Sequence, residues 1–121
     1  MAFNNQNESA SYDLSYLTEL SAGDSSFIQS IISQFIAEAP TVIHNITVAS
    51  GEQNWDELAY QVHKFAPNLA FIGINDIKEE VNKLEMFSKQ RSNLETIPQL
   101  VDILSKRCEL AINSLRKDFK L

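Results

Sequence analysis

Apolar residues recur along this chain at the spacing of three and four positions that is typical of amphipathic α-helices. No stretch shows the period-two alternation of a half-buried strand, and only three glycines and three prolines interrupt the helical pattern. Four long segments and one short N-terminal segment carry this pattern. The sequence therefore predicts an all-α protein, an antiparallel four-helix bundle with a short additional N-terminal helix.

Polar breaks and capping residues delimit the first two predicted helices. A short helix is expected over about residues 13–20, and Asp24 or a neighbouring serine can cap the helix that follows. That second helix runs to about Ser50, with Pro40 as an expected bend and Gly51 as its end. Its apolar face contains Ile28, Ile31, Ile32, Phe35, Ala39, Val42, Ile43 and Ile46.

Similar signals mark the start of the three remaining predicted helices. Asn54, with Glu57 three residues later, is expected to cap the third helix, and Asn75 the fourth. The fifth helix is expected to begin near Thr96, with Pro98 in its first turn. The apolar positions are Ile77, Val81, Leu84 and Phe87 in the fourth helix, and Ile97, Val101, Leu104, Cys108, Ala111, Leu115 and Phe119 in the fifth. The carboxylates expected on a solvated face are Glu79, Glu80 and Glu85.

The length and charge of the chain favour a small acidic domain. Its 121 residues, of which 44% are hydrophobic, suffice for one domain with a modest core. The formal net charge of −6 argues against binding to nucleic acids and to anionic membranes. No apolar run approaches the length of a membrane span. We therefore expect a cytoplasmic protein that works as a monomer.

The N-terminal residues differ from the rest of the chain in composition. Residues 1–11 are rich in Asn, Gln and Ser, and they lack the basic start and the apolar core of a signal peptide. We expect them to form a disordered leader. A single helical-bundle domain is expected to follow over residues 12–121.

The histidine and cysteine content argues against a metal site. The chain has one cysteine and two histidines, and His44 lies 19 positions before His63 without ligand-like spacing. Cys108 falls in an apolar helical stripe, which favours a buried thiol. His44 has no small neighbours and no motif around it, so we expect an ordinary surface or helix-packing role.

His63 stands apart because the residues nearest to it on its predicted helix are small. It lies about 120° around the helix axis from the centre of the core stripe. On its own side of the helix, the nearest positions are Ala59, Ala66, Pro67 and Ala70. No long side chain of the same helix covers the imidazole, so a large partner can reach it. The core stripe contains Leu58, Val62, Phe65, Leu69 and Ile72.

An exposed imidazole offers three kinds of chemistry. It is mostly neutral at about pH 7, so one ring nitrogen can act as a nucleophile, for example toward a phosphoryl group. A general base would need an orienting carboxylate and a substrate pocket, and Asp56 is the only acid in the two preceding turns on roughly the side of His63. A metal site at His63 would need further ligands, and the spacing of the histidines and the cysteine does not supply them.

His63 opens the string His-Lys-Phe-Ala-Pro-Asn, and Gly73 follows ten positions after it. This arrangement resembles the histidine-containing phosphotransfer (HPt) domain family, whose pattern is His, any residue, Leu, Lys, Gly, Ser, with a glycine ten positions after the histidine. The resemblance extends over about residues 12–119 through the order and lengths of the helices. Gly73 is expected to permit a close approach behind the site or to start the turn into the next helix.

Three positions depart from the family pattern. Ala66 stands where the family usually has a lysine near the phosphoryl group, Pro67 where it has glycine, and Asn68 where it has serine. Lys64 is the nearest cation, but it projects about 100° away from His63 around the helix. Because proline lacks an N–H and disfavours helical geometry in the residue before it, we predict a kink or loosened turn directly after His63.

A second stripe of the same helix is expected to face away from the core. It consists of Tyr60, Lys64, Pro67 and Phe71, and exposed aromatic residues on such a stripe often mark a docking surface. Alternatively, a kink at Pro67 would rotate Phe71 into the core. The residues expected to dock a partner are Ala59, Tyr60, Ala70 and Phe71.

The resemblance implies a histidine phosphotransfer protein of a two-component phosphorelay. His63 would carry a phosphoryl group between receiver-domain aspartates of a hybrid sensor kinase and a response regulator, with Lys64, Ala66, Pro67 and Asn68 beside it. The chain would bind no cofactor, because the divalent metal, Mg²⁺, would sit on the receiver domain. The sequence contains no glycine-rich phosphate loop, which fits a protein without its own nucleotide site and without enzyme activity on its own.

Two other functions belong to different classes of protein. A non-phosphorylated HPt-like adaptor would keep the bundle and the docking surface and bind receiver domains without transferring phosphate. A metal-dependent helical-bundle enzyme would need inward acids and histidines, such as a glutamate followed three residues later by a histidine. No such pair occurs in the sequence.

Overall fold

A computed structural model of the protein describes residues 11–121, and within them it contains α-helices, one 3₁₀ turn and no strand. The predicted all-α fold is therefore confirmed. The elements are α1 (Ser15–Leu20), α2 (Ser25–Gly51), α3 (Trp55–Ile72), α4 (Lys78–Gln90), the 3₁₀ turn η1 (Leu94–Thr96) and α5 (Ile97–Phe119).

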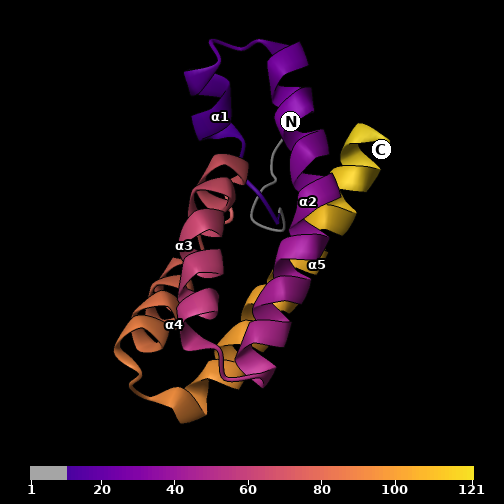
Figure 1. Cartoon of the computed structure of the whole chain (residues 1–121). Coiled ribbons are helices and arrows are strands. Elements are labelled where there is room, and N and C mark those ends of the chain that lie inside the picture. The colour runs from indigo at the N-terminus through magenta and orange to yellow at the C-terminus, as the bar shows by residue number, and fades with distance from the viewer. Residues whose placement is uncertain (1–10) are drawn as a thin grey trace.

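The four long helices form an antiparallel bundle (Figure 1). Each of α2 and α4 packs against both α3 and α5, and successive helices run in opposite directions. The short helix α1 contacts α3 and lies at the end of the bundle where α2 begins and α3 ends. This arrangement follows from the short connections, which leave each amphipathic helix beside the one that precedes it.

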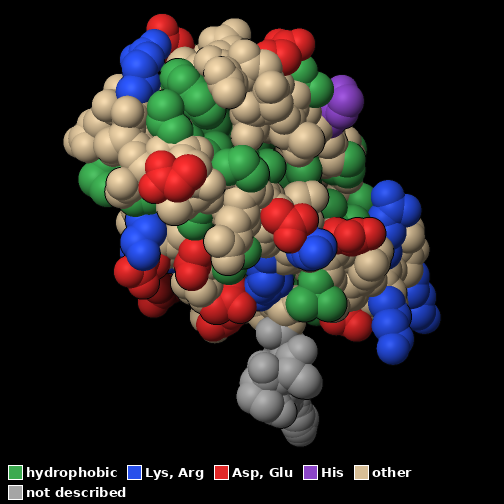
Figure 2. Space-filling view, turned by 90° about the horizontal axis from the view of Figure 1, so that it is seen from below, with side chains coloured by type: hydrophobic (Ala, Val, Ile, Leu, Met, Phe, Trp, Pro, Cys, Tyr) green, Lys and Arg blue, Asp and Glu red, His purple; other side chains and the backbone are tan. Residues whose placement is uncertain are grey.

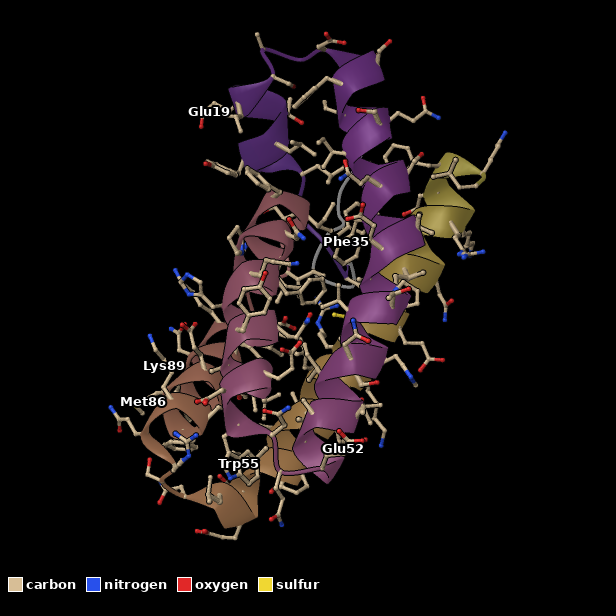
Figure 3. All side chains as sticks on the ribbon, in the orientation of Figure 1. Glu19, Phe35, Glu52, Trp55, Met86 and Lys89 are labelled. Atoms are coloured by element: carbon tan, nitrogen blue, oxygen red, sulfur yellow. The ribbon has the colours of Figure 1, made fainter. Side chains whose placement is uncertain are left out.

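The core of the bundle is built from the predicted apolar stripes. Phe35 of α2 points toward α3 (Figure 3), where its ring stacks on Phe65 with centroids 6.0 Å apart. Full burial of a leucine or isoleucine side chain contributes about 1.5–3 kcal/mol each, so these positions hold the helices in register. The largest fully buried residues include Ile32, Ile46, Leu58, Val62, Ile72, Leu84, Ile97, Leu104 and Leu115.

Two of the three predicted helix caps are confirmed. The Asp24 side chain accepts hydrogen bonds from the backbone N–H groups of Ser26 and Phe27, and Asn54 accepts one from Glu57. The prediction for Asn75 is wrong, because α4 begins only at Lys78 and no side chain caps it. Residues 75–77 instead form the turn that leads into α4.

Both internal prolines lie within continuous helices. α2 runs through Pro40 and α3 through Pro67, and both prolines are exposed. The loosened turn predicted after His63 therefore does not interrupt α3, and the alternative of a kink within a continuous helix stays a prediction. Buried residues on either side of Pro67, Phe65 and Leu69, anchor α3 to the core, and this packing overrides the local preference of proline.

The first described residue, Ser11, packs against the helical bundle. Residues 1–10 of the predicted leader lie outside the described residues, but Ser11 is buried. The guanidinium of Arg107 donates a hydrogen bond of 2.8 Å to the Ser11 carbonyl. Ser11, the last residue of the predicted leader, is thus packed against α5.

Cys108 is a buried free thiol, as predicted, and only 1% of it is exposed. Burial raises the pKa of this thiol to about 12. Because the thiolate is the reactive species, we expect Cys108 in the native protein to react with a thiol reagent at least about a thousandfold more slowly than free cysteine. Stopped-flow labelling checks this, with the urea-unfolded chain as control. Native labelling at the rate of the unfolded chain would contradict the buried position.

Candidate functional site

His63 projects from the middle of α3, and 76% of its side chain is exposed. Its Nδ1 lies 2.8 Å from Oε2 of Glu85 on α4. The glutamate side chain is only 21% exposed, so the neighbouring surface of the bundle holds it in place. The imidazole is therefore anchored at one ring edge, while most of its surface is open to a partner.

Glu85 was expected on a solvated face, and that expectation is wrong. α3 and α4 form an antiparallel pair around the turn at Gly73, so residues at similar distances from this turn lie opposite each other. His63 precedes Gly73 by ten residues and Glu85 follows it by twelve. This near symmetry is a sequence signal that would have identified the contact. Glu79, by contrast, is solvated as expected and pairs with Lys83 at 3.5 Å.

A lysine on α4 completes the charged group around His63. Nζ of Lys89 lies 3.9 Å from the same Glu85 oxygen, and the side chain stands on the outer side of α4 (Figure 3). Such exposed ion pairs contribute little to stability, about 0–1 kcal/mol. Their effect here is to place a carboxylate and an ammonium group beside the imidazole.

A shallow groove between α3 and α4 adjoins this charged group. Ala66 and Ala70 form one wall, and Lys78 and Asn82 line it from α4. Ala66 is half-buried and Ala70 is exposed. The small residues predicted around His63 thus leave open space at the position where the family places a lysine.

The other residues predicted near the phosphoryl group make contacts of their own or are simply exposed. Lys64 lies over the ring of Tyr60, with its Nζ 5.2 Å from the ring centroid, so its charge interacts with that ring. Asn68 lines a separate groove between α2 and α3, together with Phe35. Pro67 is exposed on α3.

The predicted docking residues differ in their exposure. Tyr60 is 55% exposed, and Ala70 is exposed as well. Ala59 is buried, with only 8% exposed, so it offers little surface to a partner and we leave it out of the docking surface. Phe71 is half-buried and stacks on Tyr16 of α1, so it neither enters the core nor stands free. α1 thereby extends the surface that carries Tyr60 and Phe71.

The remaining candidates are placed away from His63. Asp56 pairs with Arg91 at 3.0 Å and does not orient the imidazole. His44 is exposed on α2, as expected of a surface histidine. Figure 2 shows acidic and basic side chains intermixed with hydrophobic ones on the face seen there. Within residues 11–121, no cluster of three or more His, Cys, Asp or Glu side chains could hold a metal ion, and no helix is long and apolar enough to cross a membrane.

Gly73 combines the two structural roles expected of it. It ends α3 in the left-handed conformation, with a φ of 78°, and starts the turn toward α4. The backbone of Asp13 packs so closely against it that a Cβ atom at this position would overlap that backbone. The Asp13 N–H also donates a 3.2 Å hydrogen bond to the Ile72 carbonyl. Gly73 therefore lets the chain before α1 dock on the end of α3.

Comparison with protein families gives one match. The family model described as Hpt domain matches residues 30–118, which include α3, α4 and most of α2 and α5. Comparisons with curated proteins and with solved structures gave no match. The family match covers His63, Glu85 and Gly73.

Proposed function

The chain belongs to the Hpt domain family, whose members act as histidine phosphotransfer carriers with receiver domains in phosphorelays, and we propose that His63 is its phosphoacceptor. In this proposal, His63 takes a phosphoryl group from a receiver-domain aspartate of a hybrid sensor kinase and passes it to a response regulator. The protein works as a cytoplasmic monomer and is a carrier, not a conventional enzyme.

The observation that carries the proposal is the setting of His63. Its ring is exposed, anchored through Nδ1 by Glu85, and bordered by small residues on α3. A receiver domain needs such space, because its aspartyl phosphate must approach the imidazole in line with the bond that breaks. His44, the other histidine, lies on the outer surface of α2 and has no carboxylate hydrogen-bonded to its ring among the described contacts.

The partner supplies what this chain lacks. In the proposed transfer, the receiver domain contributes the phosphorylated aspartate and a divalent metal ion, expected to be Mg²⁺, that neutralises the phosphoryl oxygens. This chain contributes the nucleophile and the docking surface around Tyr60 and Ala70. Because both end states are phosphorylated side chains, the reaction can run in either direction.

A direct test uses purified receiver domains from the same organism, phosphorylated by acetyl phosphate in the presence of Mg²⁺. Mixing with this protein is expected to produce one acid-labile, alkali-stable phosphoryl group per chain, measured by intact mass spectrometry at neutral pH. Failure of every active, binding receiver to transfer would contradict the proposal.

One observation favours a second function, a receiver-binding adaptor that transfers no phosphate. The position usually occupied by the family's lysine is Ala66, and Lys64 is directed toward Tyr60. An adaptor would bind its receiver equally well with and without the His63 imidazole, and it would remain unphosphorylated in the test above. Binding and acceptance therefore have to be measured on the same pair of proteins.

Because position 66 carries no cation, a lysine introduced there is expected to speed phosphoryl transfer or to stabilise the phosphohistidine. We expect Ala66→Lys to raise the transfer rate or the lifetime of the phosphohistidine by roughly two- to fivefold. This factor corresponds to the interaction free energy of an exposed ion pair, up to about 1 kcal/mol. The lysine stem can extend along the groove that Ala66 lines, and its ammonium group can then approach the phosphoryl oxygens.

The matched control for this gain is Asn75→Lys. It adds the same charge to the far end of the same groove, at the exposed turn before α4 and outside the docking surface. Stopped-flow transfer and decay of the phosphoprotein are compared for both variants. Equal gains for the two lysines, or no gain for Ala66→Lys, would contradict a local role for a cation at position 66.

A further inference from the structure

We propose that the groove between α3 and α4 is a socket for one aliphatic side chain of the receiver domain, and that Lys78 at its rim pairs with an acidic residue beside that side chain. This inference rests on the proposed function, because it assumes that a receiver domain covers His63, and it adds the chemistry of the receiver surface that docks. The residues that form this α3–α4 socket are Ala66, Leu69, Ala70, Lys78, Val81 and Asn82.

The floor of the socket is apolar, and its wall on α3 is built from short side chains. Leu69 and Val81 are buried members of the hydrophobic core, with 4% and 5% exposed. Ala66 and Ala70 each contribute only a methyl group to the wall. The socket holds about 120 Å³, and a cavity of about 150 Å³ in a protein core accepts a benzene molecule. The socket therefore suits one branched aliphatic side chain, whose apolar surface would be removed from water there.

The socket continues directly from His63. α3 and α4 lie side by side (Figure 1), and residues at similar distances from the turn at Gly73 face each other. Ala66 and Asn82 therefore come one turn closer to Gly73 than the contact between His63 and Glu85, about 5 Å along the helix axis. An interface of standard size covers about 800 Å² of each partner, so a receiver domain that reaches His63 also covers the socket.

Lys78 supplies a positive charge at the rim of the socket. Its side chain is exposed, and it takes part in none of the ion pairs formed within residues 11–121. The other two lysines of α4 are engaged, because Lys83 pairs with Glu79 and Lys89 with Glu85. A cation that holds no carboxylate of its own chain is available to a carboxylate of the partner, which would also guide the approach of the two proteins.

The socket exists because position 66 carries alanine. A lysine at this position would lay its four-carbon stem along the groove and cover part of the apolar floor. With Ala66, the floor stays accessible to a side chain of the partner, and a single anchored side chain can dominate both the affinity and the choice of partner. Ala66→Lys should therefore bind a receiver domain more weakly, even though transfer within the bound complex becomes faster.

Filling the socket tests the proposal through binding alone. Unphosphorylated receiver domains from the same organism are titrated into the full chain by calorimetry, without any phosphoryl donor. We expect Ala70→Leu, which fills the socket with a side chain of this protein, to weaken binding by roughly ten- to hundredfold, the worth of one buried aliphatic side chain. Ala37→Leu makes the same change at an exposed position of α2 and should leave the affinity unchanged. Ala70 is exposed and leucine is a good helix former, so the variant is expected to fold, which circular dichroism checks.

Two further measurements test the rim and the identity of the anchored side chain. Lys78→Ala should weaken binding by roughly two- to fivefold at low salt and have no effect at about 1 M salt, where exposed charges are screened. Lys117→Ala, which removes an exposed lysine of α5, should have no effect at either salt concentration. In NMR spectra of the complex, the Ala70 methyl group should show nuclear Overhauser contacts with a methyl group of a leucine, isoleucine or valine of the receiver.

The outcomes separate the socket from the proposed function. Unchanged or tighter binding by Ala70→Leu, or an Ala70 methyl group without contact to an aliphatic side chain of the receiver, would overturn the socket. Wild-type affinity of Lys78→Ala at low salt would overturn the ionic contact at its rim. Binding that depends on the socket, in a wild type that accepts no phosphoryl group, would support the socket and overturn the phosphotransfer function. Phosphoryl acceptance with binding that Ala70→Leu leaves unchanged would do the reverse.

Discussion

Replacing His63 by glutamine is expected to abolish phosphoryl acceptance completely while leaving the fold intact. Glutamine retains a polar side chain of similar length but has no nucleophilic ring nitrogen. His63 contributes nothing to the hydrophobic core, and its exposed contact with Glu85 is worth about 0–1 kcal/mol, so the free energy of unfolding should hardly change. Intact mass spectrometry after incubation with a phosphorylated receiver measures the loss, and urea unfolding confirms the fold.

The matched control is His44→Gln, which removes the other histidine of the chain. His44 is exposed on α2, so this change should preserve both stability and full acceptance. Loss of acceptance in His44→Gln and its retention in His63→Gln would show that His44, and not His63, carries the phosphoryl group. Equal binding of a receiver by wild type and His63→Gln, with neither phosphorylated, would identify the adaptor.

Replacing Gly73 by alanine is expected to cause the largest loss of stability among the changes considered. The residue has a φ of 78°, which costs an L-amino acid about 1–2 kcal/mol. The added Cβ would also overlap the backbone of Asp13, and relief of such overpacking costs about 1–3 kcal/mol more. We therefore expect the free energy of unfolding, measured in urea, to fall by about 2–5 kcal/mol.

Gly23→Ala isolates the backbone part of this effect. Gly23 has nearly the same conformation, with a φ of 79°, but no heavy atom lies within 4 Å of the position of an added Cβ. This variant should lose only about 1–2 kcal/mol. If Gly73→Ala proves no more destabilising than Gly23→Ala, the close approach of Asp13 does not constrain residue 73.

The helices could be predicted from the sequence because their signals are local. Apolar periodicity identified the core stripes, and Asp24 and Asn54 marked the starts of α2 and α3 through side chains that reach only two or three residues along the chain. Asn75 carried the same signal but failed, because the close turn after Gly73 delays the start of α4 to Lys78. Packing of α3 on the core likewise outweighed the helix-breaking tendency of Pro67.

The candidate site was only partly predictable, because its contacts join different helices. The small residues beside His63 were visible from the spacing on one helix, but Glu85 belongs to α4 and appeared to be an ordinary surface acid. The stacking of Phe71 on Tyr16 depends on the docking of α1, which no pattern within α3 reveals. Similarly, Ser11 is buried because Arg107, 96 residues away in sequence, binds its carbonyl.

The central claim is that His63 carries a phosphoryl group from one receiver domain to another, and a two-step transfer tests it most directly. The protein is phosphorylated by one receiver domain carrying ³²P, purified from it, and mixed with a second receiver domain and Mg²⁺. We predict that the label leaves this chain and appears on the aspartate of the second receiver in nearly equal amount, and that His63→Gln never acquires it. Label that is never acquired by the wild type, or that is released only as inorganic phosphate, would contradict the account.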